Sequence, residues 1–153
     1  MIRRFHPSDE AQVRALHELA LRGVGALIQG PDAEALDRDL HDINASYIGA
    51  GGDFLVDDVD GRIIAMGALR PDGAGTAELK RMRVHPDWQR QGRGRAMLRV
   101  LEQRARDLGF RALVLDTTED LVAARSLYAS AGYVETRRTE LYGHTFIFMR
   151  KLL

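Results

Sequence analysis

The chain has 153 residues, the length of one ordinary domain, and it can bury a core without disulfides or a structural metal. It contains no cysteine, which excludes a disulfide framework, a thiolate nucleophile and a cysteine-based metal site. Its formal net charge is zero, so we expect no nucleic-acid partner, because proteins that grip nucleic acid usually have a basic excess.

The first residues do not resemble a signal peptide, since Arg3, Arg4 and His6 interrupt any apolar run. No stretch approaches the roughly 20 apolar residues that span a bilayer. We therefore expect a single domain over residues 1–153, with a cytoplasmic location and no membrane partner.

The first half of the chain predicts one strand, two helices and a hairpin. Apolar residues recur at helical spacing, and Asp60-Gly61 is a strong hairpin signal. The predicted elements are a strand at 2–5, a helix through Val13 to Ala20, a second helix from about Pro31 to Tyr47, and strands at 54–56 and 63–69.

The second half adds a strand, a helix, a strand, a helix and two strands. Proline stops the first strand at Pro86, and Gly109 and Gly132 close the two helices. The predicted ranges are strand 77–84, helix 94–108, strand 112–115, helix 122–131, and strands 133–139 and 145–149. The order β-α-α-β-β-β-α-β-α-β-β indicates a mixed α/β domain.

A glycine-rich loop, Gln89-Arg90-Gln91-Gly92-Arg93-Gly94, lies between the strand 77–84 and the following helix. Glycines allow close approach of the backbone to a ligand, and a helix start has free N–H groups and a positive dipole end. The segment lacks the Gly-Lys-Ser/Thr of a P-loop, and Met97 stands where a dinucleotide fingerprint needs its third glycine. The loop alone predicts an anion site or a plain helix cap.

Two blocks of sequence narrow this choice. The first runs from Glu78 through His85-Pro86 and the loop to Gly109-Phe110, and the second is Ala124-Arg125-Ser126-Leu127-Tyr128-Ala129-Ser130-Ala131-Gly132-Tyr133. In order and spacing they resemble the GNAT family of N-acetyltransferases. The resemblance implies the GNAT fold, with a central, mostly antiparallel sheet of about seven strands and about four helices.

The resemblance also implies a function. The protein is expected to transfer an acetyl group from acetyl-CoA, a cosubstrate, to a primary amine of a small molecule, peptide or protein, with no metal and with a possible homodimeric assembly. The resemblance implies that the strand before the loop pairs with the pantetheine arm and splays from the next strand to admit the thioester. The implied coenzyme-binding residues are Met82, Arg83, Val84, Gln89, Arg90, Gln91, Gly92, Arg93, Gly94 and Arg95.

Two residues are candidates for catalysis. The resemblance directs the hydroxyl of Tyr128 at the coenzyme sulfur as a general acid, whereas a core aromatic is the alternative. Glu78 is the candidate general base, whereas pairing with Lys80 on a solvated face is the alternative. A strand amide near Met82 is expected to stabilise the oxyanion.

One departure from the family pattern is Leu121, where many members have an asparagine that binds the coenzyme. It favours an alternative function, a catalytically weak or degenerate module that senses acyl-CoA.

The acceptor pocket is harder to read. Tyr142 and His144 are candidates for lining it, and His17 is expected to be exposed or to cap a helix rather than to bind a metal. The acidic residues between Asp32 and Asp42 favour either a cationic amine or a solvated helix face.

Overall fold

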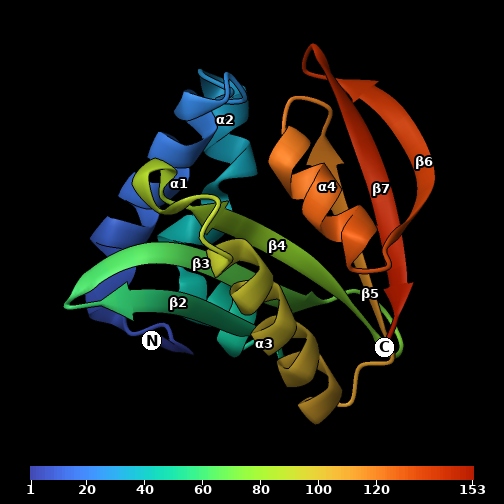
Figure 1. Ribbon diagram of the computed structural model, residues 1–153, viewed down its shortest axis with the longest axis horizontal. Coiled ribbons are helices and arrows are strands. Elements are labelled where there is room, and N and C mark those ends of the chain that lie inside the picture. Colours follow the sequence, from blue (N-terminus) through green and yellow to red (C-terminus); the bar gives the residue numbers. More distant parts are fainter.

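The computed structural model describes residues 1–153 and contains one seven-stranded sheet (Figure 1). The strands lie in the order β1-β2-β3-β4-β5-β7-β6, and only the β4–β5 pair is parallel. The mostly antiparallel sheet is therefore as predicted. The strands are β1 (Ile2–Arg4), β2 (Asp53–Val59), β3 (Arg62–Pro71), β4 (Thr76–Val84), β5 (Ala112–Thr118), β6 (Val134–Leu141) and β7 (His144–Leu152).

The chain has four α-helices, and three of them supply buried apolar side chains to two cores. Helix α1 (Glu10–Gly23) buries Val13 and Leu16 in one core, whereas α2 (Pro31–Leu36) has no buried residue. Helices α3 (Arg93–Asp107) and α4 (Val122–Ser130) belong to the other, in which Leu101 is fully buried. Full burial of each such aliphatic side chain stabilises the fold by about 1.5–3 kcal/mol.

The predicted second helix is broken, which corrects the sequence expectation. After α2 the chain forms a 3₁₀ turn, η2 (Arg38–His41), and a single π-helical turn, η3 (Asn44–Ile48). Two carboxylates of this segment have other partners. Asp39 pairs with Arg81 of β4, and Asp42 accepts a hydrogen bond from the amide of Ala45. These local and tertiary interactions outweigh regular helix geometry, although the apolar stripe is still buried at Leu40, Ile43 and Tyr47.

Strands β4 and β5 separate after a short parallel stretch, and Figure 1 shows them diverging from a common end. Only three residue pairs join them, ending at Glu78 and Val114, whereas β5 pairs with β7 along its whole length. A register shift in the β3–β4 ladder accompanies Arg81, whose φ of 57° is left-handed. Residues 79–84 therefore have no strand neighbour on the β5 side.

No helix is both long and apolar enough to cross a membrane.

Candidate functional site

The glycine-rich loop forms a concentrated set of free backbone donors. It follows the 3₁₀ turn η4 (Pro86–Trp88), in which the ring of His85 accepts a hydrogen bond from the amide of Asp87. Gly92, with a φ of 77°, lets the chain turn into α3. The six consecutive backbone N–H groups of residues 90–95 form no hydrogen bond within the protein. Together with the helix dipole, these free amides give the loop a geometry suited to an anion.

The three arginines of this segment differ in their contacts. Arg93 pairs with the buried carboxylate of Asp57 at 3.1 Å and lies over the ring of Trp88. Arg95 donates to the hydroxyl of Ser130 at 2.9 Å. Arg90 is exposed and forms no ion pair, so it is the guanidinium most available to an anion at the loop.

A cavity that we call the loop groove runs along the end of β4, the loop and α4. Nine of the ten predicted coenzyme-binding residues line it, and the exception is Gln91, whose side chain donates to the carbonyl of Asp87. Trp88 and the groove-lining residues of α4 other than Tyr128 were not predicted from the sequence. The lining residues are Ala20, Leu21, Val24, Met82, Arg83, Val84, Trp88, Gln89, Arg90, Gly92, Arg93, Gly94, Arg95, Leu121, Val122, Ala123, Ala124, Leu127 and Tyr128.

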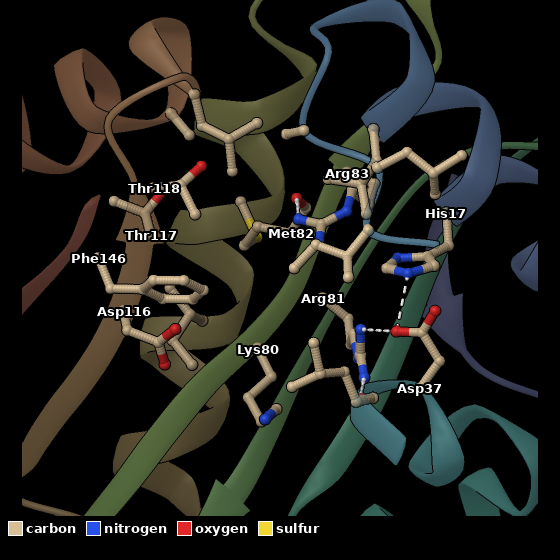
Figure 2. Close-up of a pocket in the computed structure, with 18 of the residues that line it drawn as sticks. His17, Asp37, Lys80, Arg81, Met82, Arg83, Asp116, Thr117, Thr118 and Phe146 are labelled. Carbon is tan, nitrogen blue, oxygen red and sulfur yellow. Dashed lines mark hydrogen bonds and ion pairs between the residues drawn. The ribbon is translucent and has the colours of Figure 1, made fainter. Parts of the chain in front are cut away.

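A second cavity, which we call the slot, occupies the space where β4 and β5 diverge (Figure 2). It is lined from β4 by residues 78–83, from β5 by residues 116–118, and from the α1 and α2 region by residues including His17 and Asp37. The slot and the loop groove share Leu21, Met82, Arg83, Leu121, Ala124 and Tyr128. The two cavities therefore meet, and we call these six residues the junction.

Tyr128 lies at the junction with only 5% of its surface exposed. Its ring packs edge-on against Tyr133, and its hydroxyl has no hydrogen-bond partner in the protein. Burial raises its pKa above the ordinary value of a tyrosine, so the hydroxyl keeps its proton at neutral pH. A protonated, unpaired hydroxyl at this point is able to donate to a ligand.

Glu78 lines the slot but not the loop groove. Its carboxylate pairs with Arg70 at 3.1 Å and with Lys80 at 3.4 Å, so it has partners on two sides.

Across the slot, Asp116 forms no ion pair or hydrogen bond and was missed by the sequence analysis. Asp116 is exposed, although it lines the slot. Surrounding protein still desolvates it, and this effect, with repulsion from Glu78, raises its pKa. The signal in the sequence was a charge directly after the apolar run 112–115.

Two sequence expectations are wrong, the exposure of His17 and the place of Tyr142 and His144 in the acceptor pocket. His17 is buried, not exposed; its Nε2 lies 3.1 Å from a carboxylate oxygen of Asp37, and burial lowers its pKa. Neither His144 nor Tyr142 lines the slot, because the turn they occupy lies beyond it and His144 bonds to Asp120. Phe146 supplies the aromatic lining instead. No three acidic or histidine side chains are grouped so as to hold a metal ion.

Comparison with known proteins agrees with this architecture. The model of the Acetyltransferase (GNAT) family matches residues 14–133. Rat N-acetyltransferase family 8 member 2 is 33% identical over 126 residues, covering 79% of this chain and 53% of the relative. The chain thus spans about half the length of that curated relative.

Solved structures share the fold. A GNAT acetyltransferase from Staphylococcus aureus superimposes with a TM-score of 0.88 at 17% identity, covering 99% of this chain and 98% of the other. A putative acetyltransferase from Salmonella typhimurium, solved with its cofactor acetyl-CoA, gives 0.75 at 24% identity, covering 99% and 92%.

Proposed function

The chain belongs to the GNAT acetyltransferase family, and from that premise we propose that it transfers an acetyl group from acetyl-CoA to a primary amine. The observation that supports this proposal best is the meeting of two cavities at Tyr128. One cavity ends at a loop with six free amides, suited to the coenzyme's pyrophosphate, and the other opens on the opposite side and suits the acceptor.

The reaction requires the amine nitrogen to attack the carbonyl carbon of the thioester. The carbon–sulfur bond then breaks, the nitrogen loses a proton, and the thiolate leaves as free coenzyme. A donor for the transient oxyanion is needed, and the backbone of β4 near Met82 has no strand partner on the slot side.

Tyr128 is placed to protonate the departing thiolate in this proposal. Its hydroxyl retains its proton because burial raises its pKa, and it has no competing partner within the protein. A positioned general acid typically contributes about 10²–10⁴-fold to a rate.

The amine must lose a proton before it attacks, since a free alkylammonium has a pKa of about 10.4. Glu78 remains our candidate base, acting through water from the wall of the slot. Its two cationic partners compete for the carboxylate, and Asp116 on the facing strand has none. Glu78 and Asp116 are therefore tested together.

Binding of acyl-CoA without turnover is the second candidate. Leu121 presents an apolar side chain to the junction, and both ion pairs of Glu78 occupy the candidate base. These two observations are what support a sensing module as the alternative, whereas the unpaired hydroxyl of Tyr128 at the junction supports the enzyme.

The decisive experiment combines thiol release with calorimetry. Purified protein is mixed with acetyl-CoA and a panel of primary amines, and released coenzyme is followed with a thiol reagent. The chain has no cysteine, so the protein contributes no background signal. We expect amine-dependent release and a matching acetamide by mass spectrometry.

Isothermal titration with acetyl-CoA distinguishes the two candidates. Binding without release for any amine supports the sensing module, and absence of both binding and release contradicts both. Arg99→Gln, an exposed change on α3 outside both cavities, is the control variant.

A further inference from the structure

The guanidinium of Arg83 lies in the slot without an acidic partner. Its Nη1 donates to the backbone carbonyl oxygen of Met82 at 2.7 Å, and its enclosed Nε has no partner at all. Arg81, two residues earlier on the same strand, pairs with both Asp37 and Asp39. Since only one of these neighbouring arginines has acidic partners, the missing counter-ion is specific to the position of Arg83.

Arg83 keeps its positive charge at neutral pH. Burial and repulsion from Arg81 lower its pKa to about 10, which is still well above 7. An enclosed cation without a counter-ion is unfavourable. A ligand that brings negative charge to this point forms an ion pair without having to break one.

The slot also contains the other unpaired polar groups of the interior. Four buried side-chain nitrogen or oxygen atoms in the protein lack a hydrogen-bond partner, on Arg83, His17, Thr117 and Thr118, and all four residues line the slot. Figure 2 shows Arg83 between the two threonines of β5 and His17 of α1. Buried polar atoms are nearly always paired in folded proteins. Their concentration in one cavity therefore indicates a polar ligand.

We propose that the acceptor is a free amino acid whose carboxylate pairs with Arg83 and accepts hydrogen bonds from the hydroxyls of Thr117 and Thr118. A guanidinium matches a carboxylate in both charge and fork geometry. Arg83 also belongs to the junction, so the carboxylate lies close to the reacting amine, as it does in an α-amino acid. This inference rests on the proposed function and names its acceptor.

The pyrophosphate of the coenzyme is a weaker candidate than the acceptor for the anion that pairs with Arg83. The pyrophosphate has six free amides and the exposed Arg90 at the loop, at the far end of the groove. The residues that carry the other unpaired atoms, Thr117, Thr118 and His17, line the slot but not the groove.

The test uses matched acceptors that differ in the carboxylate alone. Because Ile28, Leu36 and Phe146 give the slot an apolar wall, the first set is phenylalanine, phenylalaninamide and phenethylamine. The second set is leucine, leucinamide and isoamylamine, and the remaining amino acids follow with their amides. Thiol release gives kcat/KM for each at saturating acetyl-CoA, and titration gives the affinity for acetyl-CoA.

For the wild type we expect the free amino acid to exceed its amide and its decarboxylated amine by about 30-fold or more in kcat/KM, as for a buried charge pair. Arg83→Gln should abolish that ratio by lowering the rate with the amino acid alone. Arg83→Lys, which keeps the charge without the fork, should retain part of it. Arg99→Gln should behave as the wild type.

Three outcomes overturn the inference. If the wild type turns over amino acids and decarboxylated amines equally well, the enzyme does not recognise the carboxylate of the acceptor. If Arg83→Gln lowers kcat/KM equally for all acceptors, Arg83 stabilises the oxyanion instead. If Arg83→Gln weakens acetyl-CoA binding, Arg83 binds the coenzyme. No turnover of any amine contradicts the proposed function itself, which separates the two failures.

Discussion

Replacing Arg83 with methionine should make the ligand-free protein more stable. Burial and repulsion from Arg81 lower the pKa of this arginine well below its ordinary value, to about 10, and a shift of this size corresponds to about 3 kcal/mol against the charged form in the folded state. Folded and unfolded chains are both protonated at pH 7, so the full penalty is present there. It is relieved only above about pH 10, where the folded guanidinium begins to lose its proton.

Methionine keeps the apolar stem but loses the hydrogen bond to the carbonyl of Met82, which offsets about 1–2 kcal/mol of the gain. The net stabilisation is therefore about 1–2 kcal/mol. For a chain of this size each kcal/mol shifts Tm by about 2–4 °C, so the variant should melt about 2–8 °C higher.

Thermal unfolding followed by circular dichroism at pH 7, without ligand, measures the effect. Arg81→Met is the matched comparison, because it leaves the carboxylates of Asp37 and Asp39 without their cation and should destabilise by about 3–5 kcal/mol. A lower Tm for Arg83→Met would show that packing and the single hydrogen bond outweigh the unpaired charge, and would refute the reasoning.

Four further changes test other parts of the structure. Tyr128→Phe should lower kcat by about 10²–10⁴-fold with little change in Tm or acetyl-CoA affinity, since its hydroxyl has no protein partner; unchanged turnover contradicts the acid role. Glu78→Gln should flatten the acidic limb of the pH–rate profile, whereas persistence of that limb until Asp116→Asn is made assigns the base to Asp116. Burial lowers the pKa of His17, so below about pH 6.5 the unfolded chain binds the extra proton and stability falls by at most about 1.4 kcal/mol per pH unit. Urea unfolding at pH 5.5 and 7.5 should show a smaller loss for His17→Gln, and an equal loss contradicts this account. Gly52→Ala should unfold the protein or destabilise it by about 3 kcal/mol or more, because its new Cβ would lie 1.8 Å from the carbonyl oxygen of Leu69; a wild-type Tm would contradict the packing.

Local sequence signals predicted the elements that depend on local chemistry. Asp60 and Gly61 form the hairpin turn with left-handed φ values of 52° and 82°, and Gly92 ends the loop in the same conformation. The prediction of one continuous second helix was wrong. Asp37 and Asp39 form ion pairs with Arg81 of β4, which is distant in sequence, and these pairs hold both residues out of helical register. No periodicity in residues 31–47 encodes that partner.

The candidate site divides in the same way. The loop residues were predictable because a glycine-rich turn and a helix start are contiguous in the chain. That Arg83 and Thr118 line the same cavity could not be predicted. It depends on where the β4–β5 ladder ends, and the whole sheet determines that point. His17 was placed wrongly because its helical position alone does not reveal that the slot and Asp37 enclose it.

The short ladder between β4 and β5 also gives the molecule an interior edge. Exposed strand edges recruit other chains, and proteins usually shield them. Here residues 79–84 form an unpaired edge on a strand that both α1 and α3 contact. An extended ligand with its own amides fits such an edge as an added strand, held by main-chain hydrogen bonds. Affinity of this kind depends on backbone atoms. Under the proposed function, the side chains of β4 are therefore free to change with the acceptor without loss of main-chain hydrogen bonds to the coenzyme.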